Sequence, residues 1–376
     1  MASGIGDRIN GGARRNAAAR RRRNGGRRGG GGGREVSWEN RVSHCEWRIC
    51  GGGRRGGGEY QNRRSVRVAV VGLRTGRNDD SGAIVDIPNS FQCTFDVKSF
   101  DVGPDKGATL PCITNMLQET GVEQLVSLHG RGGKFYATDP EMDKLNLIYV
   151  LSRMRIDMYK YPSWGDRVRV RTWFAMSGKT AWRRDWLIHD ASTHEFLGAA
   201  SSIWLTVNTE TRRLGRITPE LREKYVQLTN DASWAICEGV TASKVPEMKT
   251  DSQTDAQKRS TYALEVPYGA LDMNGHVNNV EYMSWLLDAV PSGIREGFSC
   301  RSITLEYRRE GEVGSNVICD TCVYEDEDDI NDIDCIDTEN AMRFLHVLRE
   351  SETSRELVRG KSHWIRNPIA QSHELS

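Results

Sequence analysis

The sequence predicts an α+β fold made of two similar halves, each with one enclosed helix and a run of antiparallel strands. Apolar residues recur every three or four positions in two segments, residues 109–128 and 277–290, and leave only a narrow polar stripe. Several strand-like runs, separated by short turn signals, follow each segment. The order of strand, buried helix and strands therefore occurs twice, which indicates an internal duplication.

Residues 1–88 form a Gly- and Arg-rich segment without a sustained apolar period, so we expect disorder there. Residues 1–34 carry ten arginines and one acid, Asp7, a charge of +9, which leaves −8 for the rest of a chain with net charge +1. An arginine-rich, acid-poor start is typical of an organelle transit peptide, the interpretation we favour. Gly/Arg repeats also occur in RNA-binding segments, so an RNA-binding protein is an alternative.

The first half, residues 89–230, begins with a strand-like alternation that ends at Gly103 and Pro104. The helix at 109–128 follows, with Pro111 in its first turn, where a missing backbone N–H is tolerated. Four strand-like runs come next, at residues 145–159, 167–176, 181–190 and 195–208. This half is therefore predicted as one helix followed by an antiparallel meander.

A polar linker, residues 231–260, precedes the second half, residues 261–368, and residues 369–376 form a tail. The second half repeats the pattern of the first. Residues 260–270 are predicted as a strand and a loop, and the helix at 277–290 follows. Further strands are predicted at residues 301–310, 315–325, 341–351 and 355–365. The acidic run at 325–340 is expected to be a solvated loop between two strands.

The nine cysteines are scattered and odd in number, which predicts no disulfide framework and fits a reducing compartment. Cys319 and Cys322 form a C-x-x-C inside a strand-like run, where their side chains would point to opposite faces. We therefore expect neither a metal nor a redox role for this pair. No apolar run approaches the roughly 20 residues that span a bilayer, so no integral membrane segment is expected.

The stretch from Leu271 to Pro291 is the strongest candidate for a functional site. Asp272, Asn274 and His276, which can bind or move protons, stand at alternate positions just before the second helix. Two interpretations of these residues stay open. They could form a catalytic entry to the helix, or the Asp and Asn could cap the helix beside a hydrogen-bonded core histidine.

Several long segments resemble the plant acyl-acyl-carrier-protein thioesterases. In the second half they are DMNGHVNNVEYMSWLLDAVP and ITLEYRRE; in the first half they are SFDVGPDKGATLPCITNMLQETGVEQ, PEMDKLNLIYVLSRMRIDMYKYPSWGDRVRVRTW, RRDWLIHD and NTETRRLGRITPELREKY. The resemblance covers about residues 91–365, and MSGKTAWRRDWLI favours the saturated-acyl branch of the family. It implies tandem hot-dog domains, in each of which an antiparallel sheet wraps a long central helix.

The resemblance also implies a function. Members of the family hydrolyse the thioester between a fatty acid and acyl carrier protein, which ends chain elongation in plastids. We therefore expect acyl carrier protein as the partner, the plastid stroma as the location, and no cofactor, metal or nucleic acid; a homodimer is the assembly we consider. Catalysis would lie in the second half and the acyl-chain pocket in the first, with Met116, Met154 and Trp173 as candidate lining residues.

The family's catalytic motif corresponds to Asp272, Asn274 and His276, together with Glu310 at the end of LEYRRE. Glu310 or His276 would take the proton of an attacking water, and the sequence does not decide between them. Asn274 would hold the water or the carbonyl oxygen, and Asp272 would orient the site by accepting hydrogen bonds. The N-terminus of the following helix would stabilise the oxyanion.

Two positions depart from the family pattern. Gly275 stands where Gln is common, and Gly311 stands where Cys is common, so an active enzyme would exclude a cysteine nucleophile at position 311. Glu310 could also form a surface ion pair with Arg308 or Arg309 instead of acting in catalysis.

Alternatives to the thioesterase are a hot-dog dehydratase, an acyl-CoA thioesterase, and a non-catalytic acyl- or carrier-binding protein. Because acyl carrier protein is acidic, the main hypothesis predicts a basic docking face. The candidates lie in the first half: Arg167, Arg169, Arg171, Lys179, Arg183, Arg184, Arg212, Arg213 and Arg216. Alternating charges of this kind can equally mark the solvated side of a sheet.

Overall fold

The fold was analysed in a computed structural model of the chain. It describes residues 87, 89–132, 138–177, 180–226, 228–229, 244–248, 259–324 and 341–367. These residues all belong to one compact unit, residues 63–376. Nearly all of the predicted N-terminal segment, most of the linker, the acidic run and the tail lie outside the described residues.

The first half contains the predicted helix and strands. Its elements are β1 (Phe91–Asp96), α1 (Leu110–His129), α2 (Pro140–Lys144), β2 (Leu147–Met158), β3 (Arg167–Ser177), β4 (Ala181–Asp190), β5 (Phe196–Asn208) and α3 (Pro219–Val226). The side chain of Thr109 caps α1 by accepting a hydrogen bond from the N–H of Cys112 at 3.2 Å. The helix ends at Gly130, which adopts a φ of 79°. The predicted bounds of this helix are confirmed to within one residue.

The second half repeats the order of the first. Its elements are β6 (Arg259–Glu265), the 3-10 turn η4 (Tyr268–Ala270), α4 (Asn279–Asp288), α5 (Ser292–Gly297), β7 (Phe298–Tyr307), β8 (Asn316–Val323), β9 (Ala341–Glu350) and β10 (Glu356–Arg366). The predicted start of α4 at Val277 is wrong by two residues. Val277 instead forms an antiparallel bridge with Leu271, and Asn278 caps the helix by accepting from the N–H of Val280.

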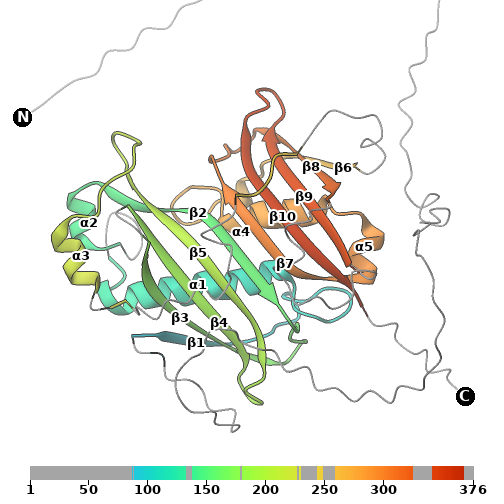
Figure 1. The fold of residues 1–376 in the computed structure, drawn as a ribbon, viewed down its shortest axis with the longest axis horizontal. Coiled ribbons are helices and arrows are strands. Elements are labelled where there is room, and N and C mark those ends of the chain that lie inside the picture. Colours follow the sequence, from blue (N-terminus) through green and yellow to red (C-terminus); the bar gives the residue numbers. More distant parts are fainter. Residues whose placement is uncertain are drawn as a thin grey trace, which may run out of the picture. The chain divides into compact units, whose positions relative to one another are not determined.

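The ten strands of the described residues form one antiparallel sheet in the order β1-β3-β4-β5-β2-β7-β10-β9-β8-β6 (Figure 1). The order in the second half mirrors that in the first. The two halves join where Arg153–Asp157 of β2 pair with Ser302–Glu306 of β7. Both predicted halves are therefore present, and they share a single sheet that is continuous across the junction.

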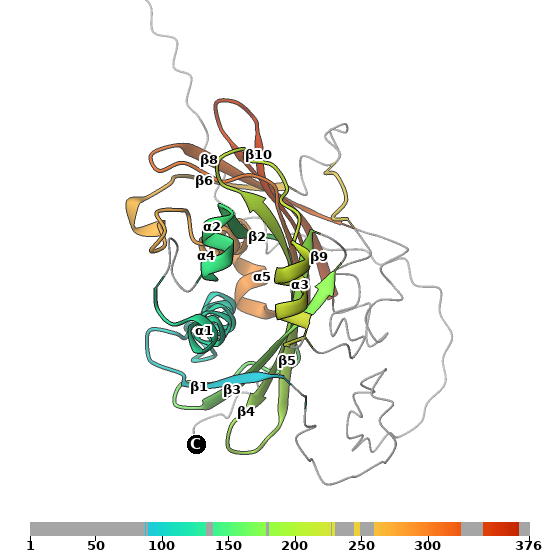
Figure 2. The same ribbon diagram turned by 90° about the vertical axis from the view of Figure 1, so that its left-hand side faces the viewer.

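Helices α1 and α4 lie on the same face of this sheet (Figure 2). They contact one another where the hydroxyl of Thr114 approaches the sulfur of Met283 at 3.2 Å. One apolar core contains buried residues from both helices and both sets of strands, including Leu117, Met283 and Leu286. Burial of this shared core against one sheet is the arrangement of the tandem hot-dog fold, and the predicted α+β class is confirmed.

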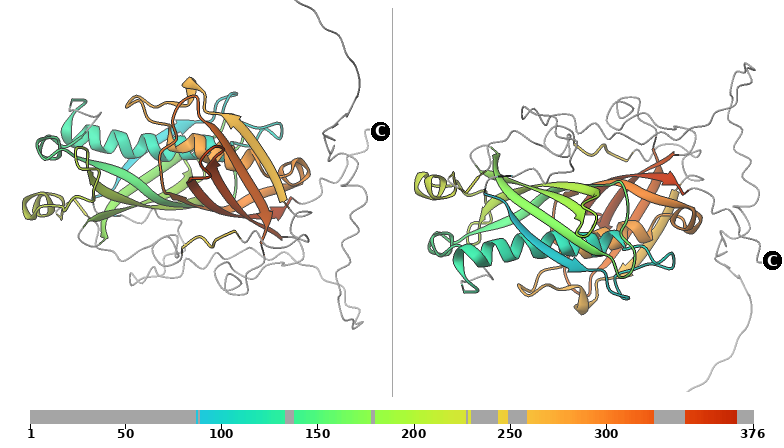
Figure 3. Two further views of the ribbon diagram at one scale, coloured as in Figure 1. Left: turned by 90° about the horizontal axis from the view of Figure 1, so that it is seen from above. Right: turned by 90° about the horizontal axis from the view of Figure 1, so that it is seen from below.

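The opposite face of the sheet carries charged side chains that are largely buried. Arg155, Asp185, Glu306 and Arg359 are all buried. The described part of the linker, residues 244–248, crosses this face on the side away from α1 and α4 (Figure 3). Val245 is itself buried there.

The sequence patterns missed the short helices α2, α3 and α5, which have too few turns to show a helical period. The first strand ends at Asp96, earlier than predicted, because the chain turns there and the N–H of Lys98 bonds to the side chain of Asp101. Within the described residues, no helix is both long and apolar enough to cross a membrane.

Candidate active site

A tight turn between η4 and α4 positions the predicted His276. One carboxylate oxygen of Asp272 accepts the N–H groups of Asn274 at 2.8 Å and His276 at 3.1 Å. The N–H of Asp272 donates to the carbonyl of His276 at 2.7 Å, and Gly275 closes the turn with a φ of 79°. Asp272 therefore organises the backbone of the turn, and its role in catalysis stays a prediction.

His276 and Glu310 are brought together from two distant segments. The imidazole Nε2 of His276 lies 3.6 Å from a carboxylate oxygen of Glu310, and both side chains are a little over 40% exposed. Arg308 instead pairs with Glu306 and Glu356, and Arg309 donates to the carbonyl of Glu356. Among the described residues, Glu310 therefore pairs with the histidine and not with the neighbouring arginines.

Asn274 does not join this pair. It is exposed, and the described residues offer no hydrogen-bond partner to its side chain. Helix α4 begins three residues after His276. Its N-terminus is capped by Asn278 and not by Asp272 or Asn274. The capping interpretation of Asp272 and Asn274 is therefore wrong, and the direct role of Asn274 in catalysis stays a prediction.

The backbone around Glu310 is held from two sides. The N–H groups of Arg308 and Arg309 both donate to the carbonyl of Leu357 on β10. The N–H of Gly311 donates to the hydroxyl of Tyr282 on α4 at 2.8 Å. Helical spacing alone places Tyr282 on the apolar face of the helix. Such spacing does not reveal the hydrogen-bond partner of a buried hydroxyl.

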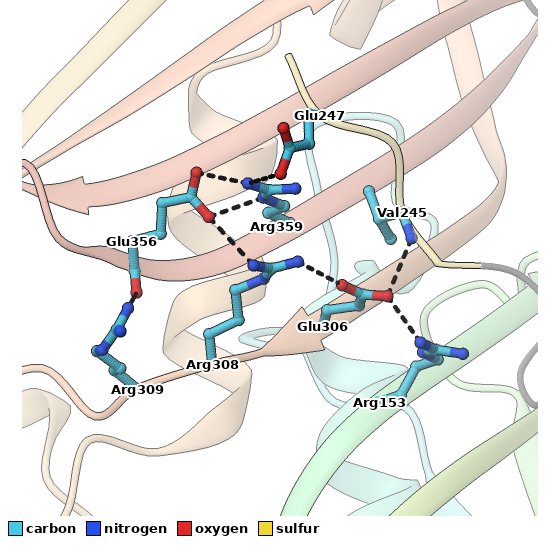
Figure 4. A network of polar contacts seen from close by, with 8 residues as sticks. All are labelled: Arg153, Val245, Glu247, Glu306, Arg308, Arg309, Glu356 and Arg359. Carbon is cyan, nitrogen blue, oxygen red and sulfur yellow. Dashed lines mark hydrogen bonds and ion pairs between the residues drawn. The ribbon is translucent and has the colours of Figure 1, made fainter.

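A charged network fixes the strand that leads to Glu310 (Figure 4). The carboxylate of Glu306 accepts from Arg153 of the first half at 2.8 Å, from the N–H of Val245 at 2.9 Å, and from Arg308 at 3.1 Å. Burial raises the pKa of Glu306, but these hydrogen bonds outweigh it and hold the pKa below its ordinary value. The linker, β2 and β7 therefore meet at this carboxylate.

The network continues along β10. Glu356 bonds through both of its oxygens to Arg359, at 2.7 and 2.8 Å, and lies 3.5 Å from Arg308. Arg359 also bonds to Glu247 of the linker at 3.1 Å. The described piece of linker is thus attached to the sheet at two points, Glu306 and Arg359.

The first half contains the same turn without the chemistry. The N–H of Gly103 donates to the carbonyl of Gly107, and that of Lys106 donates to the carbonyl of Gly103, as Asp272, His276 and Gly275 do in the second half. Lys106 has a φ of 63°, close to that of Gly275. The positions of Asp272, Asn274 and His276 are therefore occupied by Gly103, Asp105 and Gly107.

The position of Glu310 is occupied by a tyrosine in the first half. The N–H groups of Tyr159 and Lys160 both donate to the carbonyl of Leu197, as Arg308 and Arg309 do to Leu357. The next residue is Tyr161, whose hydroxyl donates to the carbonyl of Cys300 at 2.7 Å. The duplicated framework therefore carries a His–Glu pair in the second half alone.

The two turns also differ in how they meet the neighbouring hairpin. In the first half, the N–H of Ala108 donates to the carbonyl of Pro162 at 2.7 Å, and the N–H of Trp164 donates to Lys106 at 2.9 Å. The part of the second half that the structure describes makes neither of the corresponding bonds. There the turn and the hairpin face each other through His276 and Glu310.

One docking candidate is excluded by its position. Arg184 is 4% exposed and points toward α1, where it donates a hydrogen bond to Gln124. It also donates to Thr172 of β3 and lies 3.8 Å from the ring centre of Phe174 on the same strand. Burial lowers its pKa to about 9. Its inclusion in a surface docking set is therefore wrong, whereas Arg212, Arg213 and Arg216 are exposed. Lys179 lies outside the described residues.

Trp173 lies outside the core that α1 shares with α4. Its neighbour Thr172 points to α1 through Arg184, so Trp173 points to the opposite face of the sheet. Met116 and Met154 do lie in the core shared by α1 and α4. These two methionines are the candidates that remain for an acyl-chain pocket.

Residues 88–225 match the model of the acyl-ACP thioesterase N-terminal domain, and residues 252–366 match that of the acyl-ACP thioesterase C-terminal domain. The chloroplastic oleoyl-acyl carrier protein thioesterase 2 of Arabidopsis thaliana is 35% identical, over 80% of this chain and 84% of its own length. The chloroplastic palmitoyl-acyl carrier protein thioesterase of the same plant is 37% identical, over 75% of this chain and 66% of its own length. These similar identities do not separate the two substrate branches.

A solved structure gives the same result. The 12:0-ACP thioesterase from Umbellularia californica shares 30% of its residues with this chain and has a TM-score of 0.64. The similarity covers 74% of this chain and 95% of the other.

Proposed function

The chain belongs to the acyl-ACP thioesterase family, and we propose that His276 and Glu310 are the groups with which it hydrolyses fatty acyl-acyl carrier protein. The observation that supports this pair is their 3.6 Å separation across two segments that are otherwise far apart in sequence. A carboxylate and an imidazole at this distance are close enough to hold a water between them and a substrate, and such contacts tighten when the substrate binds. The product is a free fatty acid.

The reaction needs a base and an electrophilic site more than it needs a strong nucleophile. One member of the pair accepts a proton from water as the water oxygen attacks the thioester carbonyl. The C–S bond then breaks, and the leaving thiolate of the carrier receives the proton. This route requires no cysteine at position 311, where this chain has glycine.

Asp272 and Asn274 have supporting roles in this proposal. Asp272 keeps the His276 backbone in place through its two accepted N–H bonds. Asn274 stands at the rim of the site, where its exposed amide can donate to the carbonyl oxygen of a bound thioester. A neutral donor suits that task because it stabilises developing negative charge without transferring a proton.

The two halves have different roles in this proposal. Residues 261–368 carry catalysis, and residues 89–230 contribute the acyl-chain pocket near Met116 and Met154. Both methionines belong to the core that α1 shares with α4, which places them on the helix side of the sheet. Residues 231–260 connect the halves, and their described part is bound to Glu306 and Arg359.

The cellular setting follows from the relatives, whose names describe chloroplastic enzymes. We place this protein in the plastid, with the stroma as its compartment and residues 1–88 as a transit peptide. Its carrier protein would dock on exposed arginines of the first half. A homodimer is part of the same proposal.

Hydrolysis by purified protein, with acyl carrier protein and CoA thioesters as parallel substrates, tests the function. We expect free fatty acid from the carrier thioester, with Glu310→Ala and His276→Ala each at least about 100-fold slower. Glu312→Ala, an exposed acid two residues further on, is the matched control and should keep normal turnover. Near-normal turnover in Glu310→Ala or His276→Ala would remove that residue from the mechanism.

Two outcomes would favour other functions. Tight binding of the carrier thioester without release of fatty acid would indicate a non-catalytic binding protein. Equal or faster hydrolysis of CoA thioesters would indicate an acyl-CoA thioesterase.

A further inference from the structure

The loop that carries Glu310 has an unusual anchor. Strand β7 ends at Tyr307. The N–H groups of the next two residues, Arg308 and Arg309, make the last hydrogen bonds to β10, at the carbonyl of Leu357. Among the backbone N–H groups of residues 310–313, only that of Gly311 has a hydrogen-bond acceptor in the described part of the chain. That partner is the hydroxyl of Tyr282, a side chain and not another strand.

Tyr282 is well suited to hold a loop at a fixed distance. It is 3% exposed, and its ring packs edge-to-face against Trp285 at 5.4 Å and Tyr307 at 6.0 Å. It lies in the first turns of α4, the helix that starts directly after the His276 turn. Its hydroxyl therefore connects the element that carries His276 with the loop that carries Glu310.

The first half shows that the fold does not need this bond. The residue that corresponds to Tyr282, counted from the helix cap (Thr109 for Asn278), is Ile113, which has no hydroxyl. The residue that corresponds to Gly311 is Pro162, which has no N–H. Donor and acceptor are thus both missing in the half that lacks the His–Glu pair.

In the first half, a different set of hydrogen bonds connects the turn and the hairpin. There the backbone of the turn bonds directly to the hairpin, through Ala108 to Pro162 and Trp164 to Lys106. Such direct bonds would close the space in which a substrate carbonyl must lie between His276 and Glu310. A bond from behind, through a helix side chain, holds the hairpin and leaves that space open.

We propose that Tyr282 is a positioning residue of this enzyme: its hydroxyl fixes the backbone at Gly311 and so sets the position of Glu310 relative to His276. This inference rests on the proposed function of the pair. The substitution Tyr282→Phe removes the hydroxyl and keeps the ring. Because a small misplacement of a catalytic group can slow a reaction about 100-fold, we expect kcat to fall between 10- and 100-fold with KM nearly unchanged.

The experiment uses the full chain and compares Tyr282→Phe with Tyr161→Phe. Tyr161 also loses a hydroxyl bonded to the backbone, but in the half without the pair, so its kcat should stay within twofold of wild type. A second comparison places Tyr282→Phe in a Glu310→Gln background. There the hydroxyl has no carboxylate to position, and its removal should slow the residual reaction less than twofold.

Hydrogen exchange of the peptide that covers residues 308–315 gives a readout that does not depend on activity. Tyr282→Phe should exchange faster there, and Tyr161→Phe should not. Equal kcat losses in the two tyrosine variants, equal losses with and without Glu310, or unchanged exchange would each overturn the proposal. An inactive wild-type protein with the expected exchange difference would instead refute the proposed function and leave the anchor established.

Discussion

The side chain of Glu306 joins the two halves of the sheet by accepting a hydrogen bond from Arg153 at 2.8 Å. The same carboxylate holds the linker at Val245 and the strand end at Arg308 (Figure 4). Its side chain is 9% exposed, whereas Glu247, the other acid that binds the linker to the sheet, is 81% exposed. These two acids therefore provide a matched pair for a stability test.

We expect Glu306→Ala to lower the free energy of unfolding by about 2 kcal/mol, because it removes the ion pair with Arg153 across the junction and the acceptor of the buried Val245 N–H, while Arg308 keeps Glu356. Glu247→Ala should change it by less than about 0.5 kcal/mol, since Arg359 keeps both bonds to Glu356. Urea unfolding of both variants measures the difference. Similar values for the two would show that the junction does not depend on Glu306.

His346 makes the stability of the second half depend on pH. It is 1% exposed, bonds to Thr321 and Ser362 at 2.8 Å each, and burial lowers its pKa to about 3. Since the unfolded state binds the proton more readily, its contribution is fully present above about pH 6.5 and is lost as the pH falls toward 3. Between pH 7.5 and pH 5 this amounts to about 2 kcal/mol.

The measurement compares the pH dependence of unfolding in wild type and in His346→Gln. Glutamine can bond to both hydroxyls but does not titrate. Between pH 7.5 and pH 5, the free energy of unfolding of the variant should therefore fall by about 2 kcal/mol less than that of the wild type. Parallel curves for the two proteins would show that His346 does not carry this dependence.

Gly275 allows a backbone conformation that other residues adopt at a cost. Its φ is 79° and no atom lies within 4 Å of the position that a Cβ would occupy, so Gly275→Gln meets strain without a steric clash. We expect a loss of about 1 kcal/mol in unfolding free energy. Lys106 adopts the same conformation in the first half, so the turn should still form.

Gly269 is the matched control for this substitution. It also has open space around a Cβ, but its φ is outside the left-handed region. Gly269→Gln should therefore be neutral in the same urea titration. An equal loss at both positions would mean that the backbone of the turn is not the cause.

The exposed arginines after β5 are the best-placed part of the proposed docking face. Arg212 and Arg213 lie in the turn beside Leu147, the first residue of β2. Arg153 at the junction lies six positions further along that strand, about 20 Å away. Arg212→Glu with Arg213→Glu should raise KM for the carrier thioester roughly fivefold, corresponding to about 1 kcal/mol. The effect should shrink at high salt because exposed charges are screened.

Lys98→Glu reverses another exposed charge of the first half and is the control. An unchanged KM in the double variant, or an equal rise in Lys98→Glu, would remove the two arginines from the docking face.

The periodicity of the sequence was sufficient to predict the two enclosed helices and most strands. The run AWRRDWLIHD was predicted at 181–190 and coincides with β4. Alternating apolar residues specify a strand because one face is buried, and a helical apolar stripe specifies α1 for the same reason. Cys319 and Cys322 also follow this rule, since the first is fully buried and the second only partly.

The places where prediction failed are those where a side chain's environment comes from distant segments. Arg184 has the sequence context of a surface arginine, but α1 supplies Gln124 and β3 supplies Thr172 and Phe174 around it. The sequence also does not tell that Trp173 faces away from α1, which follows from the register of β3. No local pattern encodes these neighbours.

The sequence by itself determined the duplicated α+β framework, most of its strands, its two enclosed helices, and the residue types Asp, Asn, His and Glu of the candidate site. Only the tertiary structure decided that Asp272 shapes the turn, that Glu310 faces His276, and that Tyr282 holds the loop beside it. The physical reason is that periodicity reports which face of an element is buried, whereas hydrogen bonds depend on distances between elements that the sheet and its shared core set together.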